Sequence, residues 1–189
     1  MRSAILWVAT ATLLAALPAS AAKPQKAVAK LIDLSGQSAG NATFTATHHG
    51  ILVELKLSGL TQGAHGVHIH TSANCDPKTR FTSAGPHYSQ QPKLHGFNTK
   101  GGMHAGDLPN AYAGADGTLQ AAFLTNAFAL GNGKKSMFDK DGASIIVTAK
   151  GDDYLSQPDG HSGDRVACGV IIRTVGPASR GRFAKKKRH

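Results

Sequence analysis

Apolar and polar positions alternate over short stretches in the middle of the chain. In residues 51–57, apolar side chains occupy every second position, namely Ile51, Val53, Leu55 and Leu57. Successive side chains of a strand point to opposite faces of its sheet, so this period of two predicts a half-buried β-strand. Four further stretches are rich in strand-forming residues in the same way: 42–48, 118–125, 143–150 and 166–175.

Turn signals that contain glycine separate these predicted strands. They are Ser35-Gly36, His49-Gly50, Ser58-Gly59, Asp116-Gly117 and Asp141-Gly142. Strands at this spacing predict an antiparallel β-sandwich or barrel. The stretch 71–110 is too polar and too rich in Gly, Pro and His to be a strand. A loop of that length in a compact domain is usually functional.

The composition agrees with an all-β protein. The chain has 189 residues, of which 22 are Gly, and only 17% of its residues are charged. A coiled coil needs about half of its residues to be Ala, Glu, Lys, Leu or Arg, and an acidic disordered chain needs a large negative charge. Both classes are excluded, because the glycine content and the low charge favour short strands joined by turns.

The first 22 residues have the layout of a secretory signal peptide. Arg2 supplies a positive start, residues 4–16 are apolar apart from small Thr side chains, and residues 17–21 read Leu-Pro-Ala-Ser-Ala. We interpret residues 1–22 as a cleaved signal peptide and expect a periplasmic or secreted protein. A buried N-terminal helix is the alternative. The apolar run is shorter than the roughly 18–20 residues that a membrane-spanning helix needs.

Export changes the interpretation of the cysteines. The chain has two, Cys75 and Cys168. In an oxidising compartment, an even number of cysteines predicts a disulfide. The bridge would close a loop of 93 residues. In the chain-entropy description, closing such a loop stabilises the folded protein by about 4–5 kcal/mol. Two buried free thiols are the alternative.

The C-terminal residues 179–189 form a separate basic segment. They contain six cations, namely Arg180, Arg182, Lys185, Lys186, Lys187 and Arg188. Without the signal peptide and this tail, the formal net charge falls from +10 to +3, so the predicted domain, 23–178, is nearly neutral. Such a tail is usually solvated and binds polyanions weakly, here an anionic envelope surface or a polysaccharide. A tail without any function is the alternative. Only Phe183 interleaves the cations, so a nucleic-acid partner is not expected.

Histidine is enriched in the predicted loop and just before it. The chain has ten histidines, and six of them lie between His65 and His104. In the sequence His68-Ile69-His70, a strand would place both imidazoles on one face, where they could bind one ion. A solvated pair on an exposed face is the alternative.

A second set of candidate ligands lies farther along the loop. It consists of His87, His95, His104 and Asp107. Three nitrogens and one carboxylate oxygen make a closed tetrahedral set that suits structural zinc. A chance scatter of four such residues is the alternative. Imidazoles favour copper or zinc, whereas calcium and magnesium favour oxygen ligands.

Five motifs, in this order, resemble the secreted bacterial Cu/Zn superoxide dismutase family. They are Gly63-Ala64-His65-Gly66-Val67-His68-Ile69-His70, Gly85-Pro86-His87, Leu94-His95-Gly96, His104-Ala105-Gly106-Asp107 and Gly163-Asp164-Arg165-Val166-Ala167-Cys168-Gly169-Val170. The resemblance covers roughly residues 26–175. It implies an immunoglobulin-like Greek-key β-sandwich or barrel with long metal-binding and channel loops. It also implies conversion of superoxide to dioxygen and hydrogen peroxide.

The resemblance also implies the metal ligands. Three residues match copper ligands: His68, His70 and His87. Four match zinc ligands, with His87 shared between the two metals: His87, His95, His104 and Asp107. His65 matches a structural histidine that binds no metal.

Three further features carry over from the same resemblance. Asp152 matches an outer carboxylate that links a copper histidine to a zinc histidine, here His68 and His95. Arg165 matches the channel arginine that attracts and orients superoxide. The pair of Cys75 and Cys168 matches the family disulfide.

One position departs from the family pattern. The family has a fourth copper histidine where this chain has Thr148, in the sequence Ile145-Ile146-Val147-Thr148-Ala149-Lys150. We therefore expect zinc binding, with copper binding impaired by an incomplete ligand set, unless His161 replaces the missing ligand. Two functions follow as hypotheses: an exported superoxide dismutase, or a zinc-only, catalytically weak protein that binds metal or associates with the envelope. A homodimer is left open.

Overall fold

The computed structural model describes residues 25–174. The predicted signal peptide, 1–22, and the predicted basic tail, 179–189, lie outside these residues, so both stay predictions, as do the domain boundaries. Within the described range, no helix is long and apolar enough to cross a membrane.

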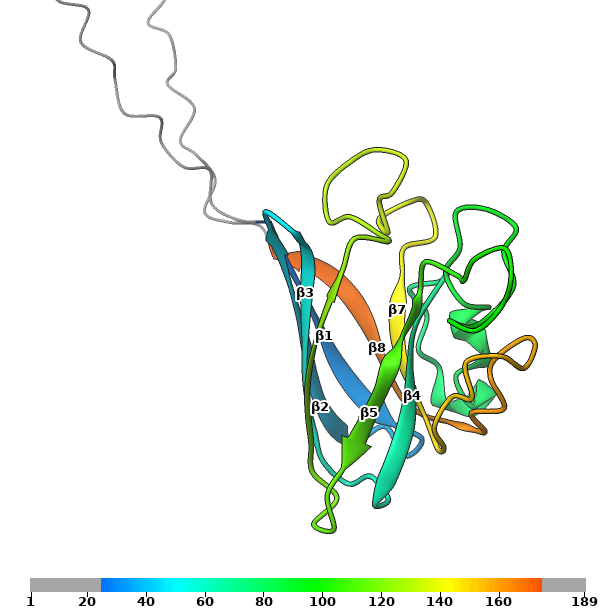
Figure 1. The fold of residues 1–189 in the computed structure, drawn as a ribbon. Helices are drawn as coiled ribbons and strands as arrows, with labels where there is room; N and C mark the ends of the chain where they lie inside the picture. The colour runs from blue at the N-terminus through cyan, green and yellow to red at the C-terminus, as the bar shows by residue number, and fades with distance from the viewer. Residues whose placement is uncertain (1–24, 175–189) are drawn as a thin grey trace, which may run out of the picture.

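Eight strands form one antiparallel sheet, in the spatial order β5-β4-β7-β8-β1-β2-β3-β6. Figure 1 shows the sheet curling around an interior. The strands are β1 (Lys26–Asp33), β2 (Ser38–Thr47), β3 (Gly50–Leu57), β4 (Gly63–His70), β5 (Asp107–Ala113), β6 (Leu119–Thr125), β7 (Ser144–Thr148) and β8 (Arg165–Thr174).

The two outermost strands, β5 and β6, contact each other, so the sheet is nearly closed into a barrel. Strands β3 and β4 follow one another in the chain but are not neighbours in the sheet, and the same is true of β6 and β7. These crossovers give Greek-key connectivity. The predicted all-β class is confirmed. Long loops follow β4 and precede β8, and Figure 1 places them on the same side of the barrel.

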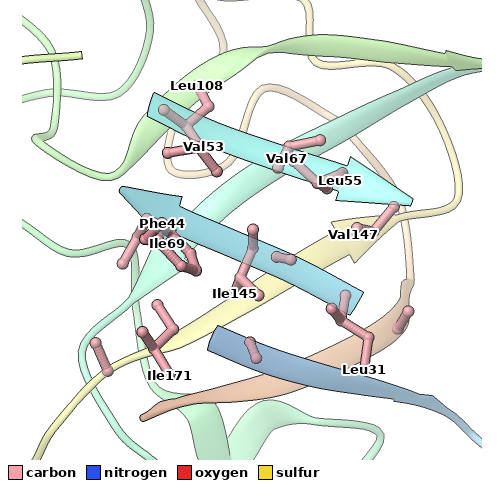
Figure 2. Packing of buried hydrophobic residues seen from close by; sticks show 14 of the residues in the cluster. Leu31, Phe44, Val53, Leu55, Val67, Ile69, Leu108, Ile145, Val147 and Ile171 are labelled. Carbon is pink, nitrogen blue, oxygen red and sulfur yellow. The ribbon is translucent and has the colours of Figure 1, made fainter. Parts of the chain in front are cut away.

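The hydrophobic core fills the interior of the barrel. On β3 the predicted alternation is observed, because Ile51, Val53, Leu55 and Leu57 are buried while the residues between them are more exposed. Phe44 of β2 is fully buried and pairs with Val53. Figure 2 shows side chains from opposite strands meeting there. The period of two in the sequence therefore marks the side of the sheet that faces inward.

One boundary prediction was wrong. The stretch 71–110 was expected to be loop, but β5 begins at Asp107. Asp107 pairs with His68, and Leu108 pairs with Val67 on β4. Both residues at the start of β5 are buried, Leu108 in the core and Asp107 beside the histidines. Backbone pairing with β4 outweighs the polar composition of this segment. The rest of the stretch is irregular except for two short 3-10 turns, η1 (Pro77–Thr79) and η2 (Thr82–Ala84).

Strand β4 is buried on both faces over its second half. Val67 and Ile69 point into the core, so His68 and His70 point to the other face, which the loop after β4 covers. The inward residues fix the strand, and the outward histidines are thereby held on a rigid support.

We expect Phe44→Ala to lower the free energy of unfolding by about 3–5 kcal/mol, because it removes a fully buried aromatic ring and leaves a cavity. Urea denaturation of the purified protein measures this change. Glu54→Ala is the control, because Glu54 is exposed on β3. A loss below about 1 kcal/mol for Phe44→Ala would show that the core collapses around the truncated side chain.

Candidate metal centre

The site is built on strand β4 and the loop that follows it. The backbone of Gly106 forms hydrogen bonds on both sides. Its N–H donates to the carbonyl of Tyr88 in the loop, and its carbonyl accepts from the amide of Ile69 on β4. A Cβ at Gly106 would collide with the carbonyl oxygen of Ile69. This close approach explains why glycine precedes Asp107, and it fixes the start of β5 beside His68 and His70.

Asp107 is the centre of the predicted zinc set. Its Oδ1 lies 2.9 Å from Nδ1 of His87, 3.1 Å from Nδ1 of His95 and 3.4 Å from Nδ1 of His104. Its Oδ2 accepts hydrogen bonds from the amides of Gly96 and His104. The carboxylate is buried, and three imidazole nitrogens converge on it. This is a donor set that suits tetrahedral zinc.

A second buried carboxylate, Asp152, joins the two halves of the cluster. Its Oδ2 lies 2.8 Å from Nε2 of His68, and its Oδ1 lies 3.0 Å from Nε2 of His95. The side-chain amide of Asn110 donates to the carbonyl of Asp152, and the Asn110 side-chain oxygen accepts from the Asp152 amide. Asp152 therefore lies where the sequence predicted, between His68 and His95, and it orients both rings.

Burial and the neighbouring carboxylates shift the pKa values of the histidines in opposite directions. Burial lowers the pKa of His87 to about 4, although Asp107 acts against this. Burial also acts to lower the pKa of His95, but Asp107 and Asp152 outweigh it and raise this pKa to about 9. Burial alone would raise the pKa of each carboxyl group. Instead, the hydrogen bonds from the imidazoles and backbone amides hold the pKa values of Asp107 and Asp152 well below their usual range.

The predicted copper half lies beside this cluster. The rings of His68 and His87 stack with their centroids 4.0 Å apart, and the His70 ring meets His87 edge-on at 4.8 Å. Among the described residues, His68 Nδ1, His70 Nε2 and His104 Nδ1 are buried without a hydrogen-bond partner. Buried polar atoms are normally paired, so unpaired imidazole nitrogens in this cluster fit a metal site.

A compact group of four side chains offers ligand atoms that all lie within 4.8 Å of one another: His68, His87, His95 and Asp107. This group contains His68 in place of His104. The 3.4 Å distance from His104 Nδ1 to Asp107 Oδ1 nevertheless places His104 at the same carboxylate. The structure thus brings together the side chains of both predicted metal sets.

Thr148 lies at the site, and its hydroxyl is occupied. The residue is buried, and Oγ1 donates to the carbonyls of Lys150 and Gly66 at 3.0 and 3.3 Å. A Cβ built on Gly66 would lie 2.6 Å from Thr148 Oγ1 and 2.9 Å from His68 Cε1, so the threonine borders the His68 ring. Thr148 therefore lies on the His68 side of the histidine cluster.

The structure places His161 at the surface. Its side chain is 78% exposed, and its Nδ1 lies 3.7 Å from a carboxylate oxygen of Asp153. It is not part of the buried cluster. His48 and His49 are exposed in the turn between β2 and β3, and His189 lies outside the described residues. His65 is buried, with its ring nitrogens facing the carbonyls of Thr148 and Thr61.

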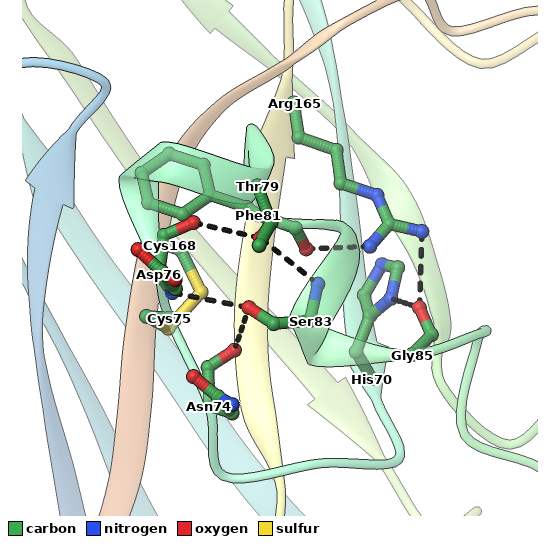
Figure 3. Close-up of a disulfide and its surroundings, with 10 residues drawn as sticks. All are labelled: His70, Asn74, Cys75, Asp76, Thr79, Phe81, Ser83, Gly85, Arg165 and Cys168. Carbon is green, nitrogen blue, oxygen red and sulfur yellow. Dashed lines mark hydrogen bonds between the residues drawn. A yellow bond between two sulfur atoms is a disulfide. The ribbon is translucent and has the colours of Figure 1, made fainter.

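Arg165, at the start of β8, is held by the loop after β4. Its Nη1 donates to the carbonyl of Phe81 at 2.7 Å, and its Nη2 donates to the carbonyl of Gly85 at 3.0 Å. The Gly85 carbonyl also lies 2.8 Å from His70 Nδ1 and orients that ring (Figure 3). An open cavity of about 380 Å³ borders the guanidinium, lined by Thr82, Gly85, Pro86, His87, His104, Pro158, Asp159 and Arg165.

The predicted disulfide between Cys75 and Cys168 is present, with the two Cα atoms 5.6 Å apart. It ties the loop to β8, three residues beyond Arg165. Beside it, the Phe81 amide donates to the carbonyl of Asp76, and the Ser83 hydroxyl donates to the carbonyl of Asn74. Figure 3 shows this segment connecting the disulfide to Gly85. The covalent link therefore helps to hold the carbonyls that orient Arg165 and His70.

Sequence reasoning missed the residues that act through their backbone or through packing. Phe81 and Gly85 orient Arg165 by their carbonyls. Gly160, with φ of +69°, packs its backbone directly against Asp152 and His95, and a Cβ there would overlap the carboxylate. Of these three residues, only Gly85 belongs to a motif that the sequence shows, Gly85-Pro86-His87.

We expect the metal-free protein to lose about 2 kcal/mol of stability as the pH rises from about 7 to about 9.5. The pKa of His95 is raised from 6.5 to about 9 in the folded protein, so its contribution is complete below pH 6.5 and disappears as the pH passes about 9. Urea unfolding across this range measures the loss.

His95→Gln should remove most of this slope, while His48→Gln, at an exposed turn, should leave it unchanged. An equal slope in the wild type and in His95→Gln would contradict the assignment to His95. The carboxyl groups and His87 titrate below this range and do not contribute to it.

Comparison with known proteins agrees with this geometry. Residues 38–171 match the family described as Copper/zinc superoxide dismutase (SODC). The superoxide dismutase [Cu-Zn] of Caulobacter vibrioides is 41% identical over 139 residues, which cover 72% of this chain and 79% of that protein. Superoxide dismutase [Cu-Zn] 2 of Aquifex aeolicus is 38% identical over 82% of this chain and 91% of that protein.

A solved structure of a SOD-like protein from Bacillus subtilis superimposes with a TM-score of 0.72 at 32% identity, covering 77% of this chain and 97% of that chain. The family match spans most of the described residues, and the relatives cover more than two thirds of the chain. The chain therefore belongs to the copper/zinc superoxide dismutase family.

Proposed function

We propose that this protein is an exported superoxide dismutase-like metalloprotein with a complete zinc site and a weakened copper site. It would convert two superoxide ions and two protons to dioxygen and hydrogen peroxide. The observation that carries this proposal is the buried cluster of imidazoles, in which three ring nitrogens have no hydrogen-bond partner; two of its histidines, His87 and His104, line the cavity that Arg165 also lines.

The zinc set is proposed to be His87, His95, His104 and Asp107. Each imidazole turns its Nδ1 toward one carboxylate oxygen, so all four donors surround one point. The outer contacts are also satisfied, because His95 Nε2 faces Asp152 and His104 Nε2 faces the carbonyl of Lys93. Such outer partners fix ring orientation and raise the affinity of a metal site.

The copper set is proposed to be His68, His70 and His87. His68 and His70 each keep one buried ring nitrogen free, and the other nitrogen is held by Asp152 or by the Gly85 carbonyl. His87 would use its second ring nitrogen here, because its Nδ1 faces Asp107. When bound, copper would supply one-electron redox chemistry, taking an electron from one superoxide and returning it to another.

Arg165 would bind the substrate. Its guanidinium is fixed by two carbonyls and borders the same open cavity as His87. Neither carbonyl neutralises the positive charge, so the guanidinium can attract superoxide and position it near His87. His87 would hold a proton on the nitrogen that is not used for zinc, which is the role that the family resemblance gives it.

Thr148 is the reason to propose weakened copper binding. A hydroxyl is a hard, neutral oxygen and a poor ligand for Cu(I). The Thr148 hydroxyl is moreover engaged with the carbonyls of Lys150 and Gly66. The exposed position of His161 does not favour it as a replacement ligand.

A second candidate function is a zinc-only, catalytically weak protein that binds metal or associates with the envelope. One specific contrast favours it: the zinc set is complete, whereas Thr148 occupies the fourth copper position. A protein of this kind would retain zinc but would bind copper only weakly. Copper affinity measured on the zinc-loaded protein separates the two functions.

We propose a periplasmic or secreted location, in agreement with the disulfide between Cys75 and Cys168. The basic tail would then meet an anionic envelope surface or a polysaccharide. A homodimer is compatible with this proposal but is not required by it.

The test compares the mature wild type with Thr148→His, each loaded with zinc and copper. We expect Thr148→His to bind copper at least about tenfold more tightly, since even an outer partner of a ligand changes affinity by that factor. It should also consume superoxide faster. Competition with a copper chelator measures the affinity, and stopped-flow superoxide decay measures the rate.

Unchanged zinc binding is the control that shows that Thr148→His is folded. A wild type that consumes superoxide rapidly supports the dismutase function. A wild type that does not consume superoxide, beside a Thr148→His variant that does, supports the zinc-only function. Equal copper affinity and equal rate in the two proteins would contradict the role given to position 148.

A further inference from the structure

His95 lies in a part of the loop that no strand supports. Residues 91–98 are irregular, and among them only His95 and Gly96 are buried. The ring of His95 is held at both nitrogens, by Asp107 at 3.1 Å and by Asp152 at 3.0 Å. A buried backbone also needs hydrogen-bond partners for its amide and its carbonyl. Another segment must therefore supply these partners.

The side chain of Gln157 binds both backbone groups of His95. Its Oε1 accepts from the His95 amide at 2.8 Å, and its Nε2 donates to the His95 carbonyl at 2.9 Å, where the Thr99 hydroxyl is a second donor. One side-chain amide thus replaces the pair of hydrogen bonds that a neighbouring strand would provide. Nε2 also donates to the carbonyl of Leu155 at 2.9 Å, so both of its hydrogens are used.

The segment that carries Gln157 is itself held against His95 and Gly96. The carbonyl of Tyr154 accepts from the amide of Asn98 at 3.0 Å. Gly96 has a φ of +97°, and a Cβ there would collide with the Tyr154 carbonyl. The two loops therefore approach each other at the backbone, which keeps the Gln157 amide within reach of His95.

Zinc binding would change which contacts hold His95. In the proposed zinc set, His95 Nδ1 and Asp107 Oδ1 are both ligands, so the hydrogen bond between them is lost when zinc is bound. Asp152 then still holds Nε2, and Gln157 still holds the backbone. Both residues belong to the loop between β7 and β8. A single contact at Nε2 would leave the ring free to swing about that point, whereas two contacts fix its direction.

We propose that Gln157 is a positioning residue of the zinc site, which acts through the backbone of His95 and aligns its ring with the other three ligands. This inference rests on the proposed function, because it uses the zinc set given above. Residues that orient a metal ligand typically change metal affinity by about 10- to 100-fold. Gln157 is exposed, so it can be replaced without opening the hydrophobic core.

The decisive variant is Gln157→Glu, which keeps the size of the side chain and the acceptor for the His95 amide. It replaces the donating NH₂ group by an oxygen that faces the carbonyls of His95 and Leu155, so it breaks half of the clamp. Its negative charge alone would attract a zinc ion, so a lower zinc affinity cannot come from the charge. Gln120→Glu is the matched control, because Gln120 is exposed on β6.

We expect Gln157→Glu to bind zinc about tenfold less tightly than the wild type. Gln120→Glu should match the wild type. Competition with a chromophoric zinc chelator measures the affinity on copper-free protein. Cobalt(II) in place of zinc gives a second readout, because tetrahedral Co(II) absorbs visible light more strongly than six-coordinate Co(II). The visible bands of Gln157→Glu should be weaker or shifted, as a misaligned ligand requires.

Gln157→Ala removes the clamp without adding a charge and should show the same loss of zinc affinity. Urea unfolding of the metal-free proteins separates positioning of the ligand from support of the fold. Equal zinc affinity and identical cobalt spectra in the wild type and both Gln157 variants would overturn the proposal. A lower unfolding midpoint of the metal-free variants with unchanged zinc affinity would overturn it too.

Superoxide decay of the copper- and zinc-loaded proteins is measured separately. If the wild type does not consume superoxide but zinc affinity falls in Gln157→Glu, the dismutase function fails and the role of Gln157 stands. If all the proteins consume superoxide and bind zinc equally, the role of Gln157 fails and the dismutase function stands. A wild type that binds neither zinc nor cobalt would overturn both.

Discussion

The site depends on one buried carboxylate, that of Asp107. Three imidazoles and two backbone amides point at its two oxygens, and the residue begins the strand that pairs with β4. An unpaired charge in this place would be costly, so the loop must close around Asp107 with its histidines turned inward. The same contacts hold the pKa of Asp107 well below its usual range and keep it ionised, the state in which a carboxylate can bind a metal.

The barrel supports this cluster through one rigid strand, β4. Val67 and Ile69 lock β4 into the core, and this leaves His68 and His70 on the outward face. Asp152 connects His68 to His95, so the strand and the loop share one hydrogen-bonded frame. The disulfide holds the remaining part of the loop against β8. The fold, the disulfide and the two carboxylates therefore all restrict the same five imidazoles and one guanidinium.

Some of the charged residues in and near the site come from the loop between β7 and β8. The segment between β7 and β8 supplies Asp152 to the buried frame and Asp159 to the cavity wall. Arg165 begins the next strand. The register thus places Arg165 directly opposite Thr148.

The amino-acid sequence determined the all-β class, the strands with a clear period of two, the disulfide partners and the histidines and carboxylates that the structure gathers in one cluster. These features depend on local periodicity or on motifs. The pattern did not reveal β1, the start of β5 at Asp107, the carbonyls of Phe81 and Gly85, or the surface position of His161. Each of these depends on contacts between segments far apart in the chain. Backbone carbonyls have no residue-specific signature, so only the tertiary structure decided what they orient.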